Sequence, residues 1–285
     1  MKVAVIGASG VIGRVTVPVL LAQGFSVRAV NPSPGQPMEA IDGELELTTG
    51  NILDSDDMLR AVSGCDIAVH VATSVPKPGP VRDWSTNDAI RRQGTVNLLQ
   101  ACAKHKVKHY VQQSVAMLYD AGGDGWLDET SPIRPTEALK SAVDMEMHVR
   151  DSEVPWTILR GGTLYGPSTG REGGWLQQAR DGSLRLPSDG TDFASLVHQD
   201  DLAAAMAAAC IKRPRNCILN VVDDEPVRWR ELYGFVAERA GTAQPQENGP
   251  VVYPSQRVSN RRAKAALEWR PGYPSYREGL QRLGQ

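Results

Sequence analysis

The stretch Lys2-Val3-Ala4-Val5-Ile6-Gly7-Ala8-Ser9-Gly10-Val11-Ile12-Gly13 decides the fold of this chain. Its apolar run predicts a buried strand, and its glycines predict a tight turn that opens a helix from about Val11. Glycines in this setting let the backbone approach a pyrophosphate, while the helix N-terminus offers free N–H groups and the positive end of its dipole. We therefore expect a dinucleotide site in which some residues shape the turn and others lie near the phosphates. The shaping residues are Gly7, Gly10 and Gly13, and those near the phosphates are Ser9, Val11 and Ile12.

Strand-like and helix-like segments alternate beyond this turn, which predicts βαβ units and a parallel sheet. The expected strands are Lys2–Ile6, Ser26–Val30, Leu45–Thr49, Asp66–Val71, Lys108–Gln113 and Trp156–Arg160. The expected helices between them cover about 54–63, 86–104 and 136–152. The pattern predicts an α/β fold with a Rossmann-type doubly wound parallel sheet of about six or seven strands.

After Gly161 the elements become shorter and Gly/Pro-rich turns separate them. Helices are expected near Asp201–Ile211, Arg228–Ala240, Asn260–Leu267 and Ser275–Leu283, with Asp200 or Asp201 as the N-cap of the first. We predict an NAD(P)-binding lobe over residues 1–165 and a smaller substrate-binding lobe over 166–285, with some exchange of chain between them.

The composition of the chain limits the classes of binding partner that we expect. The chain has 285 residues, 41% hydrophobic and 22% charged, with a formal net charge of −2 and no long basic run. Neither nucleic acid nor a membrane surface is therefore an expected partner, and a small-molecule substrate is. The four cysteines lie far apart, without metal-ligand spacing, which indicates no disulfide framework, no metal site and a cytoplasmic location. The chain is expected to be a monomer or a homodimer.

The end of the second strand bears on the choice of dinucleotide. NAD enzymes usually place an acid there to bind the ribose 2′-OH, whereas this chain has Asn31, with Arg14 just past the last glycine and Arg28 nearby. We expect Arg14 and Asn31 to lie at the adenosine ribose. The pattern favours NADP over NAD and leaves NAD possible.

Several later motifs resemble, in order, those of the atypical and extended short-chain dehydrogenases/reductases, the NAD-dependent epimerase/dehydratase-like family. They are Gly50-Asn51-Ile52-Leu53-Asp54, His70-Val71-Ala72-Thr73, Gly94-Thr95-Val96-Asn97-Leu98-Leu99 and Leu159-Arg160-Gly161-Gly162-Thr163-Leu164-Tyr165-Gly166-Pro167. The resemblance implies that Asn51 and Ile52 contact adenine and that Ala72 and Thr73 line the ribose.

The chain departs from the family at its catalytic positions. Family enzymes carry a Ser or Thr after the fifth strand and a Tyr-x-x-x-Lys on the next helix, where Tyr transfers a proton and Lys lowers its pKa. The corresponding residues here are Val115, Ala138 and Ala142. Lys140 is expected to point away from the helix face that Ala138 and Ala142 share.

Three functions remain open. The first is an NAD(P)-dependent oxidoreductase or epimerase-like enzyme with a non-standard acid, for which Tyr165, Tyr119 and Ser114 are the candidates because they follow strand ends. The second is an NADP(H)-binding redox sensor or regulator without catalysis. The third is a non-redox dehydratase, isomerase or cyclase on the same fold. We expect the first.

Overall fold

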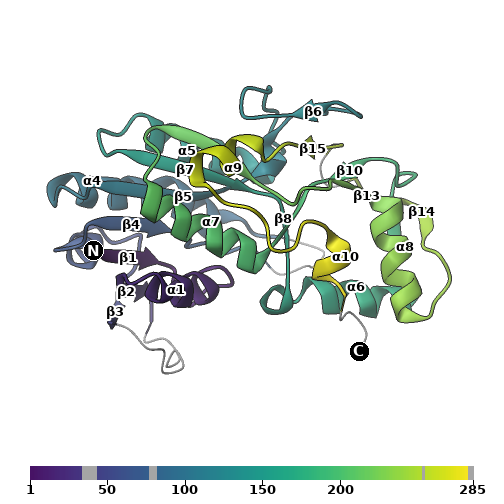
Figure 1. The fold of residues 1–285 in the computed structure, drawn as a ribbon, viewed down its shortest axis with the longest axis horizontal. Helices are drawn as coiled ribbons and strands as arrows, with labels where there is room; N and C mark the ends of the chain where they lie inside the picture. The colour runs from purple at the N-terminus through teal and green to yellow at the C-terminus, as the bar shows by residue number, and fades with distance from the viewer. Residues whose placement is uncertain (34–43, 77–81, 252–253, 282–285) are drawn as a thin grey trace. The chain divides into compact units, whose positions relative to one another are not determined.

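A computed structural model describes residues 1–33, 44–76, 82–251 and 254–281. Its main feature is a seven-stranded sheet with the order β12-β7-β5-β4-β1-β2-β3 (Figure 1). The strands are β1 Lys2–Ile6, β2 Ser26–Asn31, β3 Leu45–Thr49, β4 Ile67–His70, β5 His109–Val115, β7 Trp156–Gly161 and β12 Cys217–Val221. Strands β1 to β5 pair in parallel, and their order reverses at β1. The predicted fold class is confirmed.

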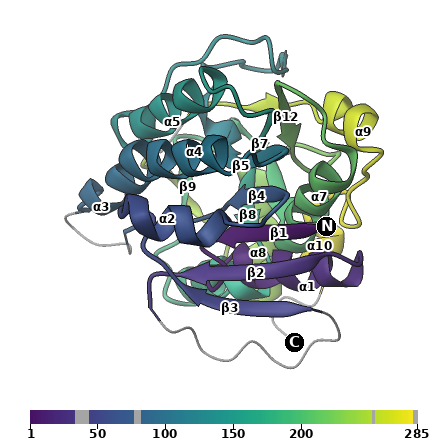
Figure 2. The same ribbon diagram turned by 90° about the vertical axis from the view of Figure 1, so that its left-hand side faces the viewer.

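Helices cover both faces of this sheet, with α2, α4 and α5 on one face and α1 and α7 on the other (Figure 2). Their bounds are α1 Gly13–Ala22, α2 Ser55–Val62, α3 Ser85–Ala89, α4 Thr95–Lys104, α5 Lys140–Arg150 and α7 Gln199–Lys212. Because both faces are covered, β1 is a continuous apolar run, and Val3, Ala4 and Val5 have no exposed surface. The helix expected over 86–104 is interrupted by a π-helical turn, Ile90–Gly94, that joins α3 to α4.

The chain divides into two compact units. Unit 1 contains Met1–Ser114, Glu137–Leu159 and Ala203–Leu219, and unit 2 contains Val115–Thr136, Arg160–Leu202 and Asn220–Gln285. The chain passes repeatedly between the units because β5, β7 and β12 begin in unit 1 and end in unit 2. Residue 165, where the sequence suggested a boundary, falls inside unit 2.

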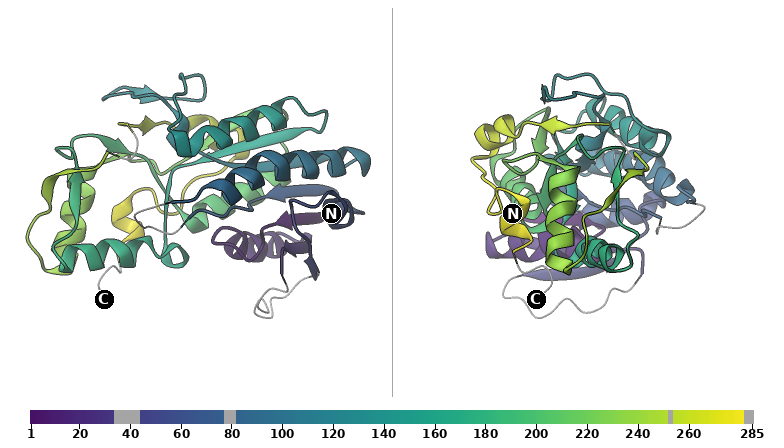
Figure 3. Two further views of the ribbon diagram at one scale, coloured as in Figure 1. Left: turned by 180° about the vertical axis from the view of Figure 1, so that it is seen from behind. Right: turned by 90° about the vertical axis from the view of Figure 1, so that its right-hand side faces the viewer.

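Among its described residues, unit 2 contains short paired strands and the whole of four α-helices, besides 3₁₀ turns and the start of α7. The pairs are β8 Thr163–Tyr165 with β11 Leu196–His198, β10 Phe193–Ala194 with β13 Val227–Arg228, β9 Arg185–Pro187 with β14 Gln246–Gly249, and β6 Trp126–Leu127 with β15 Arg257–Val258. The helices are α6 Arg171–Arg180, α8 Trp229–Ala240, α9 Arg261–Leu267 and α10 Tyr276–Gly279. Helices α6 (teal) and α8 (yellow-green) pack side by side in Figure 3. Their apolar faces form a core with Tyr165, Trp175 and Trp229.

Two sequence expectations about unit 2 are corrected. Helix α10 ends at Gly279, short of the expected Leu283, which lies outside the described residues. Helix α7 begins at Gln199, so Asp201 is inside its first turn and is not its N-cap. The Asp201 carboxylate instead accepts the backbone N–H groups of Gly272 and Tyr273, at 2.6 and 2.9 Å. It therefore anchors the segment that leads to α10.

Candidate dinucleotide site

The strand register of unit 1 brings the predicted cofactor residues to one edge of the sheet. Ile6 on β1 lies opposite Val30 on β2 and opposite His70 on β4. The segments that follow these residues therefore leave the sheet at the same level. They carry the glycine turn, Asn31, and the pair Ala72 and Thr73. In open parallel sheets this carboxyl edge, at the point where strand order reverses, is where ligands bind.

The glycine turn is packed too closely for any larger residue. Gly7 has φ +90°, and a Cβ added to it would lie 2.5 Å from the Cα of Ala72. A Cβ on Gly13 would lie 2.2 Å from the carbonyl oxygen of Gly7. Ser9, Gly10 and Val11, at the top of the turn, are exposed. No side chain caps the N-terminus of α1, and its first turn has no acidic residue. The turn therefore presents a bare helix N-terminus, which fits the pyrophosphate of a dinucleotide.

Asn31 and Arg14 lie beside this turn. The Oδ1 atom of Asn31 accepts the backbone N–H of Ser9 at 2.7 Å, and Asn31 is buried. Asn31 therefore holds the turn in place. The exposed guanidinium of Arg14 donates to the carbonyl of Ser9 at 3.0 Å. Its remaining N–H groups leave a positive charge beside the turn for an anionic group such as a 2′-phosphate.

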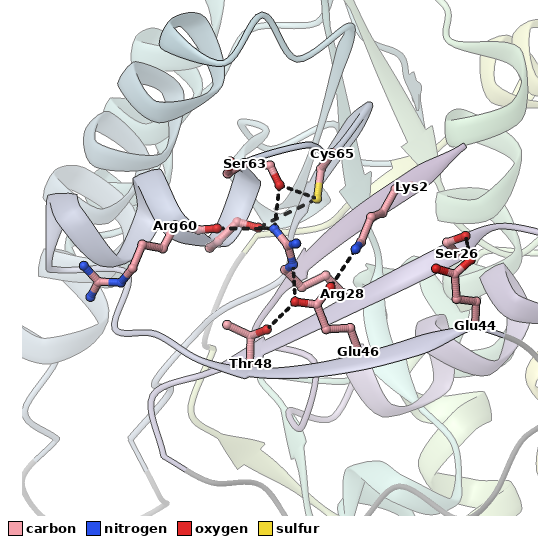
Figure 4. Close-up of polar contacts among 10 residues, drawn as sticks. Lys2, Ser26, Arg28, Glu44, Glu46, Thr48, Arg60, Ser63 and Cys65 are labelled. Atoms are coloured by element: carbon pink, nitrogen blue, oxygen red, sulfur yellow. Dashed lines mark hydrogen bonds and ion pairs between the residues drawn. The ribbon is translucent and has the colours of Figure 1, made fainter.

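Arg28 does not share that role, although the sequence placed it near the ribose. Its guanidinium donates to the carbonyls of Arg60, Ala61 and Ser63 at 3.2, 3.0 and 2.7 Å, and its Nε atom donates to Glu46 at 2.9 Å (Figure 4). Arg28 thus satisfies the open carbonyls at the C-terminus of α2. It supports the fold and is not available to a phosphate.

The predicted adenine contacts follow β3. Ile52 is buried against Gly94, where an added Cβ would lie 3.0 Å from the Ile52 side chain. The carbonyl of Ile52 accepts from the Asn97 side chain at 3.0 Å. Asn51 is exposed, and its Oδ1 atom accepts the N–H of Leu53 at 3.0 Å. The Gly94-to-Leu99 motif therefore fixes the backbone that presents Asn51.

All three candidate proton donors are engaged in buried hydrogen bonds. The hydroxyl of Ser114 donates to Glu146 at 2.6 Å, and that of Tyr119 donates to Asn220 at 2.7 Å. The Tyr165 hydroxyl donates to Asp223 at 3.2 Å. Burial raises the pKa of Tyr119, and burial together with Asp223 raises the pKa of Tyr165. A higher pKa makes each phenol a weaker proton donor.

Ala138 and Ala142, which the sequence analysis aligned with the family's Tyr and Lys, lie where a short 3₁₀ turn, Glu137–Leu139, leads into α5. Ala138 is in the 3₁₀ turn, and Ala142 is fully buried in α5. Lys140 is exposed and pairs with Glu137 at 2.6 Å. Ala138 is therefore outside α5, which corrects the expectation that Ala138 and Ala142 share one helix face.

Sequence reasoning missed a buried polar group at the end of β4. The Nδ1 atom of His70 lies 3.0 Å from both the Tyr110 hydroxyl and the Gln112 side-chain oxygen. Burial lowers the pKa of His70 to about 4. Nearby, Asn87 is fully buried and its Oδ1 atom accepts the N–H of Ser74 at 3.0 Å, while Arg91 is 5% exposed. Asn87 and Arg91 fall inside a segment that the sequence predicts only as a helix, so its periodicity gave no sign that they are buried polar groups.

Comparison with known proteins agrees with this geometry. A model of the NAD(P)H-binding family matches residues 7–214. The chain is 30% identical, over 99% of its length and 100% of the relative, to a Streptomyces protein named 3-diazoavenalumate denitrifying reductase. It is 26% identical to the Thermus thermophilus UDP-glucose 4-epimerase solved with NAD, with a TM-score of 0.80, covering all of this chain and 97% of the other. The dTDP-glucose 4,6-dehydratase of Streptomyces venezuelae shares the fold, with 23% identity, a TM-score of 0.86 and coverage of 100% and 96%.

No helix in the described part of the chain has the length and apolar character that a membrane crossing requires. The predicted resemblance and the predicted binding of a nicotinamide dinucleotide are confirmed. The chain therefore belongs to the NAD(P)H-binding family, within the epimerase/dehydratase-like short-chain dehydrogenases/reductases.

Proposed function

We propose that this protein is an NADPH-dependent reductase that delivers hydride to an aryl diazonium compound. One observation carries the proposal: the chain has a complete pyrophosphate turn, but Val115, Ala138 and Ala142, the residues that we align with the family's catalytic positions, have no proton-transferring group. Such a protein suits an acceptor that takes a hydride and requires no proton. The Streptomyces relative, whose name describes removal of nitrogen from a diazo compound, supports this choice.

The chemistry of this acceptor balances without an acid. A bound reduced nicotinamide supplies hydride. In an aryl diazonium ion the hydride forms the new aryl C–H bond, the C–N bond breaks, and N₂ leaves with the electron pair of that bond. A carbonyl acceptor differs because its alkoxide must be protonated, which is the work of the missing Tyr and Lys. The chain must therefore bind the acceptor, orient it toward the nicotinamide and exclude water.

NADP is the proposed dinucleotide. The end of β2 has no carboxylate to bind a ribose 2′-OH, because Asn31 stands there and is engaged by Ser9. Arg14 places an exposed positive charge beside the same turn. Both features favour a 2′-phosphate.

The origin of the new hydrogen tests the proposal. The purified protein is incubated with a benzenediazonium salt and NADPH deuterated at C4, and the arene is analysed by mass spectrometry. We expect deuterium at the former C–N carbon from deuterated NADPH and none from D₂O. A parallel reaction with the Gly13→Ala variant, which cannot form the turn, measures reduction by NADPH in free solution.

Two results would reject this function. A rate no higher than that of the Gly13→Ala control would show that the protein does not catalyse the reduction. Label from D₂O would show that a proton is involved. A carbonyl acceptor would then be the next candidate, with Tyr165, Tyr119 and Ser114 as our proposed proton donors.

A further inference from the structure

Two buried side chains on one helical segment of unit 1 have donor groups without acceptors. Asn87 in α3 is fully buried, and its Oδ1 atom is held by the N–H of Ser74, so its Nδ2 atom points elsewhere and has no partner among the described residues. Arg91 follows one turn later, in the π-helical turn Ile90–Gly94. Residues four apart face the same side of a helical segment, and π turns inside helices often occur at functional sites.

The guanidinium of Arg91 is buried but weakly bound. Its Nη1 atom donates to the carbonyl of Ala138 at 3.4 Å and to the hydroxyl of Ser141 at 3.3 Å, both long contacts. In the described ranges Arg91 forms no ion pair, and the side-chain hydrogen bonds of Arg91 are these two from Nη1. A buried charge without a counter-ion is costly, so an arginine in this state is suited to an anionic ligand.

The neighbouring acids pair with Arg92, although the Oδ1 atom of Asp88 has no hydrogen-bond partner among the described residues. Asp88, the nearest carboxylate on the same segment, lies 3.6 Å from Arg92. Arg92 also donates to Asp144 on α5 at 2.7 Å. Arg92, Asp88 and Asp144 form an ion-pair network of their own. Burial lowers the pKa of Arg91, and the charge of Asp88 offsets this only in part, so Arg91 has no ion pair of its own among the described residues.

The position of Asn87 and Arg91 in the fold indicates which ligand they bind. Helix α5 packs against the π turn, and Arg91 contacts Ala138, just before that helix, and Ser141, in its first turn. Asn87 is bonded to Ser74, which directly follows the proposed ribose contacts Ala72 and Thr73. The pair therefore lies at the sheet edge where the reacting end of the dinucleotide is expected.

We propose that Asn87 and Arg91 bind a carboxylate group of the hydride acceptor and so orient the molecule. This inference rests on the proposed reductase function, and it adds that the substrate is an aryl carboxylic acid. Both side chains offer only donors, which matches a carboxylate, because a carboxylate only accepts and carries the charge that Arg91 lacks. Ribose hydroxyls, the alternative ligand at this edge, would also need acceptors.

Binding measurements with cinnamate and its uncharged amide, cinnamamide, test the site without turnover. Dissociation constants are measured by calorimetry on the NADP⁺-saturated protein. We expect wild type to prefer cinnamate by at least about 10-fold, the low end for a hydrogen bond to a charged group. Arg91→Met should abolish that preference, and Arg91→Lys, which keeps the charge but not the planar fork, should retain part of it. Arg92→Met, on the same turn, is the matched control and should keep it.

Several results would overturn the inference. One is a wild-type protein that binds the acid and the amide equally. Another is an Arg91→Met variant with an unchanged preference, or one whose loss is in the affinity for NADPH, which would assign the pair to the dinucleotide. If Arg91→Met does not fold, Arg91→Lys and Asn87→Ala carry the same comparison. Failure of the diazonium reaction with a retained Arg91-dependent preference for cinnamate would reject the proposed function alone.

Discussion

Replacing Gly7 by alanine should damage both the fold of unit 1 and its dinucleotide site. The new Cβ would lie 2.5 Å from the Cα and 2.7 Å from the backbone N of Ala72, and backbone atoms cannot move aside as a flexible side chain can. Gly7 also has φ +90°, a conformation that alanine adopts at a cost. Gly24 is the matched control, because it has φ +78° and nothing within 4 Å of an added Cβ.

Comparing Gly24→Ala with Gly7→Ala separates the cost of a left-handed backbone from the cost of overpacking. A left-handed backbone costs an alanine about 1–2 kcal/mol, which is the whole effect expected for Gly24→Ala. Overpacking in a tight core costs about 1–3 kcal/mol more, so Gly7→Ala should lower the free energy of unfolding by about 2–5 kcal/mol. Because Ala72 must move, the affinity for NADPH should also fall, by at least about 10-fold, whereas Gly24→Ala should leave it unchanged.

Urea unfolding, followed by the fluorescence of the six tryptophans, measures the free energies, and a fluorescence titration with NADPH measures the affinities. The difference between the two variants is the critical quantity. If Gly7→Ala and Gly24→Ala lose the same free energy and bind NADPH equally well, the close approach of Gly7 to Ala72 is wrong. The assignment of the turn to the pyrophosphate would fall with it.

Three further predictions concern single side chains. Arg14→Met should weaken NADPH binding about 10-fold and leave NADH binding unchanged in the same titration, and equal losses for both would contradict a 2′-phosphate contact. Burial lowers the pKa of His70 to about 4, so His70 is neutral in the folded protein. In the unfolded chain it takes up a proton below about pH 6.5. Stability should therefore fall by roughly 3 kcal/mol as the pH drops from about 6.5 to 4, and the unfolding of His70→Gln should depend less steeply on pH. Tyr119→Phe, which removes the bond to Asn220, should cost about 1 kcal/mol and leave diazonium reduction unchanged; a large loss of turnover would make Tyr119 a proton donor.

The sheet and its turn were predictable from sequence because their signals are local. Period-two and period-3.6 patterns fix strands and helices, and Gly13 is required by contacts with Gly7 and Ala8 in the same turn. The hydrogen bonds of the polar side chains were not predictable, since their partners are distant in sequence. Arg28 looks like a phosphate ligand until its bonds to the end of α2, more than thirty residues away, are seen. Ser114 and Tyr119 looked available for the same reason.

The proposed lack of a proton donor and the proposed carboxylate-binding role of Arg91 are consistent with one another. A carbonyl reductase must both orient its substrate and protonate the alkoxide, and the family's Tyr and Lys serve the second task. Where the acceptor expels N₂ and requires no proton, orientation is the main demand that remains, and a fixed guanidinium meets it. Arg91→Met should therefore raise the KM of a carboxylate-bearing diazonium substrate and leave the deuterium label in the product derived wholly from NADPH. An unchanged KM for this substrate in Arg91→Met would mean that Arg91 does not orient the acceptor, and the two proposals could not both hold.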